Sequence, residues 1–115
     1  MLKENDNLEE ALRMYVSLFE NAQYFEAHEI LEEAWHPLRR KNHPLKNLVK
    51  GIINAAISFE HIKRDQQEAN RKAQKVMASY DRYRVLATPQ IEHGVLFCKI
   101  CTIVDVEKEK YPKVF

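Results

Sequence analysis

The chain has 115 residues, of which 45% are hydrophobic and 30% charged, and its formal net charge is +1. This length and composition predict one ordered helical domain, residues 1–115, with a core of its own. The small net charge and dispersed basic residues argue against a nucleic-acid partner, and two glycines and four prolines are too few for a turn-rich sandwich or barrel.

The amino-terminal segment is polar and lacks the apolar run of a signal peptide. No apolar stretch is long enough to span a bilayer. Two cysteines without an export signal fit reduced thiols. The chain is therefore expected to be a cytoplasmic protein with no membrane partner.

The first helix is predicted from an apolar stripe at helical spacing, formed by Leu8, Leu12, Tyr15, Val16 and Phe19. Asn7 precedes this stripe and is expected to cap the helix, with Glu10 completing a capping box three residues later. A short break at residues 21–23 is expected to end the helix.

A second helix is expected over about residues 23–36. Pro37 and Pro44 are expected to bracket a basic loop, residues 38–43. The consecutive cations of this loop are Arg39, Arg40 and Lys41. Because no aromatic residues are interleaved with them, a solvated surface is the favoured interpretation.

The third helix, about residues 45–63, is apolar on two sides. One face consists of Leu48, Ile52, Ala55, Ala56 and Phe59, and a second face carries Ile53 and Ile57. A helix that is apolar nearly all round is usually central in its domain. The predicted fold is therefore all-α, a compact bundle of about five to six helices around this one.

Two further helices complete the predicted bundle. The fourth covers about residues 66–86, and Thr88 and Pro89 then mark a turn or a short helix. Gly94 separates them from the last element, residues 95–110. That element has high strand propensity, but its apolar residues also fit a helical stripe. Because the sequence offers no partner strand, a helix is expected.

The second helix places polar residues on its expected core face. The predicted stripe contains Tyr24, Phe25, His28, Leu31, Glu32 and Trp35. Burial of a polar group costs about 2–7 kcal/mol unless the group is hydrogen-bonded. Asn54 and His61, on one side of the third helix, are the expected companions of His28 and Glu32.

Two interpretations of these polar residues stay open. In the first, His28, Glu32, Asn54 and His61 form a buried hydrogen-bond network that holds the helices together. In the second, His28, Glu32 and His61 hold a divalent metal ion or a small ligand, with Trp35 as a wall of the pocket and a hydrolytic reaction as one option.

The remaining motifs give weaker evidence for a functional site. Glu26, Glu29 and Glu33 form an acidic line, and a solvated face is favoured over a carboxylate metal site because the glutamate–histidine spacing does not match one. Cys98 and Cys101 lie within an apolar run and are expected to behave as small core residues. The sequence has no phosphate-binding glycine loop and no hydrolase signature.

One segment resembles the signature of a small bacterial and archaeal family catalogued as domain of unknown function 309. The matching residues are Tyr24, Phe25, Glu26, Ala27, His28 and Glu29, followed by Leu31, Glu32 and Trp35. A second block, residues 51–56 with His61, fits more loosely, since Asn54 stands where the family usually has glutamine. The resemblance covers about residues 10–85.

The resemblance implies an all-α array of helices and no established activity. It also groups seven residues into one candidate site, which are Glu26, His28, Glu29, Glu32, Trp35, Asn54 and His61. The favoured function is a non-enzymatic binding or interaction module that acts through a protein partner or self-association. The alternative is a small metal- or ligand-binding site, and the sequence leaves open whether the protein is an enzyme.

Overall fold

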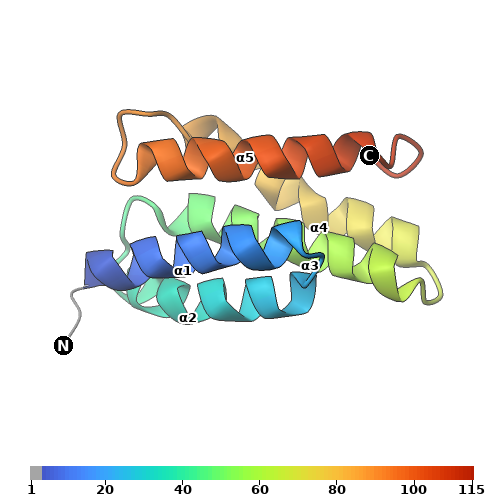
Figure 1. The fold of residues 1–115 in the computed structure, drawn as a ribbon, viewed down its shortest axis with the longest axis horizontal. Helices are drawn as coiled ribbons and strands as arrows, with labels where there is room; N and C mark the ends of the chain where they lie inside the picture. The colour runs from blue at the N-terminus through green and yellow to red at the C-terminus, as the bar shows by residue number, and fades with distance from the viewer. Residues whose placement is uncertain (1–3) are drawn as a thin grey trace.

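The computed structural model describes residues 4–115, which form an all-helical bundle (Figure 1). Its elements are α1 (Glu4–Glu20), α2 (Tyr24–Arg40), α3 (Lys46–Arg64), α4 (Ala69–Tyr83), the 3-10 helix η1 (Arg84–Leu86) and α5 (Gly94–Glu109). The all-α prediction is confirmed, and the last element is a helix. No helix within these residues is long and apolar enough to cross a membrane.

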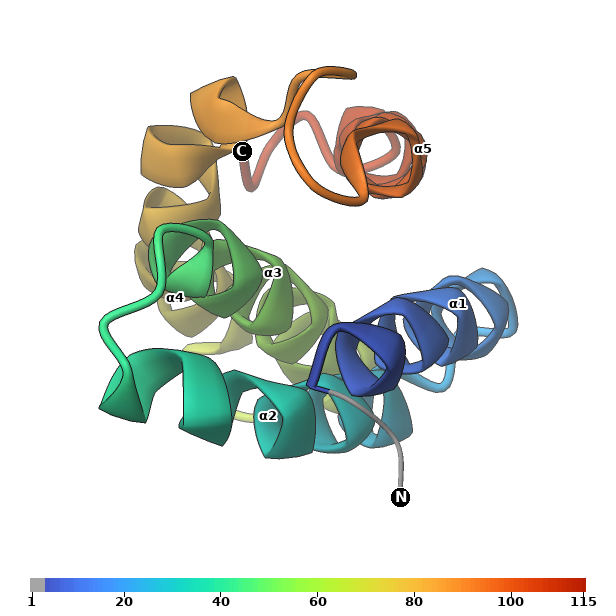
Figure 2. The ribbon, with the colours of Figure 1, turned by 90° about the vertical axis from the view of Figure 1, so that its left-hand side faces the viewer.

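The third helix is the centre of the bundle, as its two-sided apolar pattern predicts. Figure 2 shows α3 surrounded by the other helices, with α2 below it and α5 above it. The buried residues of α3 are Leu48, Val49, Gly51, Ile52, Ile53, Ala55, Ala56, Ser58 and Phe59. Since these side chains point in several directions around the helix axis, α3 contributes to the core on more than one side.

Polar groups within the core tie the helices to one another. The hydroxyl of Tyr15 on α1 donates to the carbonyl of Ile52 on α3 at 2.8 Å. The hydroxyl of Ser58, which is fully buried, donates to the carbonyl of Ala73 on α4 at 2.6 Å. These bonds satisfy polar atoms that would otherwise be costly to bury.

The close packing of α3 against α4 depends on Gly51. A Cβ atom at this position would lie 3.1 Å from the carbonyl oxygen of Ser79 and 3.2 Å from Cα of Tyr80. Both contacts are with the backbone of α4, so any side chain here would push the two helices apart.

The predicted boundary between α2 and a basic loop is wrong. The helix continues through Pro37 to Arg40, and Leu38 is buried in the core. Proline costs roughly 3 kcal/mol inside a helix, but burial of a leucine side chain stabilises by about 1.5–3 kcal/mol. The backbone N–H of Lys41 also donates to the carbonyl of Pro37, which continues the helical bonding.

Two other predicted helix ends also differ. Asn7 does not cap α1, because it lies within the helix, which begins at Glu4. The fourth helix begins at Ala69 rather than near residue 66. The delay follows from the left-handed backbone of Asp65 (φ 49°) and Glu68 (φ 62°), which forms a turn in place of a helical start.

Candidate functional site

The core face of α2 is centred on different residues from those predicted. Its buried residues are Tyr24, Ala27, Leu31 and Leu38. Phe25 is 40% exposed, and His28 and Glu32 are only half-buried, so the prediction that these three lie on the core face is wrong. Ala27, which is fully buried, lies on the core face in their place.

His28 makes its hydrogen bond within its own helix turn. Its Nδ1–H donates to the carbonyl oxygen of Phe25 at 2.6 Å, and the two rings meet edge to face with centroids 5.0 Å apart. A carbonyl oxygen only accepts, so Nδ1 carries the proton and Nε2 is the acceptor in the neutral ring. This leaves Nε2 as the only lone pair that His28 can offer to a ligand.

Glu32 is paired with a histidine other than the predicted one. Its Oε1 lies 4.0 Å from Nε2 of His36, one turn further along α2, and both side chains are partly exposed. Pairs of this kind contribute little stability. The predicted bond between His28 and Glu32 is not formed, because each side chain turns to a group on α2 outside the pair.

Asn54 and His61 lie on the partly exposed side of α3. The amide nitrogen of Asn54 donates to the hydroxyl of Ser79 on α4 at 2.7 Å. Burial lowers the pKa of His61, and the positive charges of Lys72 and Arg64 lower it further. Asn54 is thus bonded to α4, and the two cations that lower the pKa of His61 come from α3 and α4.

The structure does not assemble the expected buried network. Within residues 4–115, no hydrogen bond or ion pair joins any two of His28, Glu32, Asn54 and His61, and none of the four side chains is fully buried. The same residues include no group of three His, Cys, Asp or Glu side chains placed to hold a metal ion. A metal site on His28, Glu32 and His61 therefore stays a prediction without geometric support.

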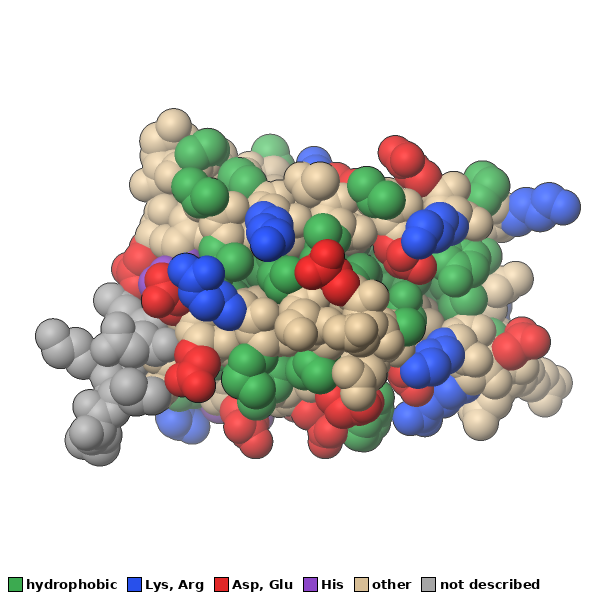
Figure 3. Space-filling view, in the orientation of Figure 1, with side chains coloured by type: hydrophobic (Ala, Val, Ile, Leu, Met, Phe, Trp, Pro, Cys, Tyr) green, Lys and Arg blue, Asp and Glu red, His purple; other side chains and the backbone are tan. Residues whose placement is uncertain are grey.

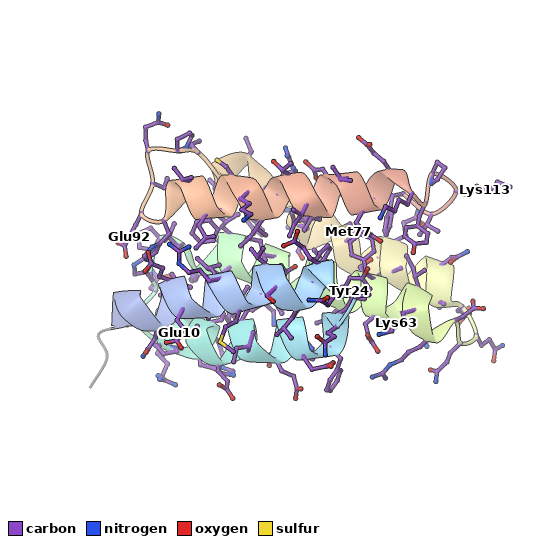
Figure 4. The ribbon with its side chains drawn as sticks, in the orientation of Figure 1. Glu10, Tyr24, Lys63, Met77, Glu92 and Lys113 are labelled. Carbon is purple, nitrogen blue, oxygen red and sulfur yellow. The ribbon has the colours of Figure 1, made fainter. Side chains whose placement is uncertain are left out.

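A different feature lies on the opposite side of α2. A groove of about 380 Å³ between α1 and α2, called the α1/α2 groove below, has an apolar lining of Ala11, Met14, Ile30, Ala34, Pro37 and Leu38. Asn7, Glu10 and Glu33 add polar groups, and no basic side chain of the described residues lines it. Figure 3 shows hydrophobic side chains between α1 and α2 with acidic side chains beside them, and Figure 4 marks Glu10 on α1.

One residue of the acidic line of α2, Glu33, lines this groove. Glu26, Glu29 and Glu33 are all exposed, which confirms the predicted solvated face. Glu10 and Glu33 form the carboxylate rim of the groove, and neither they nor Glu26 and Glu29 have a hydrogen-bond or ion-pair partner among the described residues. The groove could not be predicted from the sequence, because Met14 and Ile30 lie outside the apolar stripes of α1 and α2.

The two cysteines are free thiols, as expected. Cys101 is buried and Cys98 is half-buried, and burial raises the pKa of the Cys101 thiol. A raised pKa suppresses the reactive thiolate. The prediction that Cys101 is a small core residue is confirmed.

Comparison with known families identifies the chain. The model of the family described as Domain of unknown function (DUF309) matches residues 12–73, which is more than half of the chain, and the protein belongs to this family. The chain has no significant match among curated proteins or solved structures. The matched range runs from α1 into α4 and includes most of the α1/α2 groove.

Some signature residues of α2 lie in the core and others lie on the surface. Ala27 and Leu31 are fully buried and build the core. Glu26 and Glu29 are exposed on the outer surface. Packing thus accounts for the apolar part of the signature, whereas the two carboxylates have no structural partner among the described residues.

Proposed function

We propose that this protein is a non-enzymatic helical binding module, and that the α1/α2 groove docks an amphipathic helix of a partner protein. The observation that supports this proposal is an apolar groove whose rim carboxylates have no ion-pair partner among the described residues. The proposed partner helix carries apolar anchor residues on one face and basic residues beside them.

The apolar lining of the groove fits a helix side chain. Met14 is 42% exposed although it is a large hydrophobic residue, and it lines the groove from α1 as Ile30 does from α2. Methionine adapts its shape to different apolar partners. Insertion of an amphipathic helix into a hydrophobic groove is a recurrent mode of peptide recognition.

The negative charge of the rim favours a partner helix with basic residues beside its apolar face. Glu10 lies on one wall and Glu33 on the other, with Glu26 and Glu29 further along α2. The net charge of the chain is only +1, so this acidity belongs to one face rather than to the whole protein. Complementary charge around an apolar contact raises association rates and selects among partners.

The proposal can be tested by fluorescence anisotropy with three labelled helical peptides. The first is a leucine–lysine amphipathic helix, the second replaces its lysines with glutamates, and the third scrambles the first so that the apolar face is lost. We expect saturable binding of the first peptide alone. Equal binding of the scrambled peptide would show that charge alone drives the association and would contradict the proposal.

A matched pair of variants locates the binding site. Met14→Asp introduces a charge into the groove, whereas Val95→Asp introduces the same charge at an exposed apolar residue of α5, outside the groove. We expect Met14→Asp to weaken binding by at least about tenfold, which corresponds to about 1.4 kcal/mol. Val95→Asp should leave the affinity unchanged, and equal losses in both variants would count against the groove.

A further inference from the structure

A cluster of cations surrounds the only tryptophan of the chain. The ammonium nitrogen of Lys50 lies 4.3 Å from the ring centroid of Trp35, and the guanidinium carbon of Arg39 lies 5.7 Å from it. The indole N–H is bonded to the carbonyl of Lys46, so the ring is held at the junction of α2 and α3. From the sequence, Arg39 was expected to lie in a solvated loop with no interleaved aromatic residues. In the structure it lies beside the aromatic ring of Trp35.

These cations are not paired with any carboxylate of the residues that the structure describes. Arg39 and Lys50 form no ion pair with any of the described residues, and Lys46 bonds through its ammonium group to the side-chain oxygen of Asn42. Elsewhere in the bundle, cations that pair with carboxylates are Arg13, Arg64, Arg71, Arg84, Lys108 and Lys110. The positive charges of Arg39 and Lys50 are therefore not neutralised by a carboxylate among the residues that the structure describes.

Two of these cations lie near the end of a helix at which positive charge is unfavourable. Arg39 lies in the last turn of α2, where positive charge is favourable. Lys46 and Lys50 instead lie in the first two turns of α3, and the first turn contains no acidic residue. Positively charged side chains near the amino-terminal end of a helix are repelled by the positive end of the helix dipole. A bound anion would offset this repulsion.

We propose that Arg39, Lys46 and Lys50 together with Trp35 form a binding site for a phosphate-bearing anion. The guanidinium group can make two parallel bonds to phosphate oxygens, and each ammonium group adds a point charge. Arg39 is exposed and Trp35 and Lys50 are half-buried, so the cluster is open to solvent. The site lies apart from the α1/α2 groove and does not depend on the function proposed for it.

Trp35 provides a readout specific to this site, because the chain has a single tryptophan. We would titrate the protein with inorganic tripolyphosphate at constant ionic strength and follow tryptophan fluorescence, with sodium chloride as the control. The site predicts a saturable change with tripolyphosphate. A change that does not saturate, or that chloride reproduces at equal ionic strength, would overturn the proposal.

Variants connect the signal to the cations. The double variant Arg39→Gln/Lys50→Gln should bind tripolyphosphate at least tenfold more weakly, whereas Lys75→Gln, at an exposed position of α4, should bind as the wild type does. Unchanged affinity in the double variant would overturn the proposal. Circular dichroism confirms folding, and the single variant Lys50→Gln gives the same test if the double variant unfolds.

A second titration identifies the source of the phosphate. ATP without magnesium carries the same triphosphate group as tripolyphosphate, with a nucleoside added. Tighter binding of ATP would show that the ligand is a nucleotide whose base contacts the indole ring. Equal affinities would show a site for the phosphate chain alone.

Discussion

The indole N–H of Trp35 donates a hydrogen bond to the carbonyl oxygen of Lys46 at 3.0 Å. This bond joins the helix that carries the family signature to the first residue of the central helix α3. Trp35 was expected to form the wall of a pocket. In the structure its indole N–H is a tether between α2 and α3.

Removal of this tether should destabilise the fold moderately. Trp35→Phe keeps an aromatic ring but deletes the N–H donor, and loss of one hydrogen bond of this kind costs about 0.5–1.5 kcal/mol. We expect the midpoint of urea unfolding, followed by circular dichroism, to fall accordingly. An unchanged midpoint would show that the bond contributes nothing to stability.

The signature residues should divide into two classes when they are substituted. Ala27 is fully buried, so Ala27→Leu should overpack the core and cost about 1–3 kcal/mol of unfolding free energy. Glu29 is exposed, so Glu29→Gln should change stability by less than about 0.5 kcal/mol. Urea unfolding of both variants checks the division, and a large loss in Glu29→Gln would refute a surface role for this carboxylate.

Gly94 begins α5 at a place where no side chain fits. A Cβ atom there would overlap the carbonyl of Thr88 and lie 2.7 Å from the carbonyl oxygen of Pro89. Gly94→Ala should therefore cost about 1–3 kcal/mol, in spite of the better helix propensity of alanine. Gly51→Ala, whose closest contact would be 3.1 Å, should cost less, and the reverse order of melting temperatures would contradict this account.

His61 should make the fold more sensitive to acid. Burial and the nearby cations Lys72 and Arg64 lower the pKa of His61 below its ordinary value of 6.5 in the folded state. As the pH falls below that ordinary value, the unfolded chain binds a proton that the folded chain does not, so stability is lost until the lowered pKa is passed. Between about pH 7 and pH 5, a range that includes the usual histidine pKa, the melting temperature of His61→Gln should fall less than that of the wild type. Equal decreases would exclude a contribution from His61.

The sequence predicted the fold well where the apolar pattern was strong. The two-sided pattern of α3 identified the central helix, and the helical stripe of α5 outweighed its strand propensity. The end of α2 could not be predicted from local rules. Pro37 is an ordinary stop signal, and only the burial of Leu38 against the rest of the bundle explains why the helix continues.

The candidate site was harder to predict than the fold. Helical periodicity placed His28 and Glu32 near the core stripe, but the exact centre of the stripe depends on how α2 packs in the bundle, and the structure buries Ala27 and Leu31 there. The partner of Asn54, Ser79, comes from a different helix and leaves no sequence pattern. The α1/α2 groove likewise arises from the packing of two helices.

The central claim is that the rim of the α1/α2 groove selects a basic helix. The most direct measurement is a charge reversal, in which Glu10→Lys/Glu33→Lys is titrated with the leucine–lysine and leucine–glutamate peptides. Our account predicts that the variant loses affinity for the lysine peptide and gains affinity for the glutamate peptide, each by at least about tenfold. If the reversed groove still prefers the lysine peptide, the claim is contradicted.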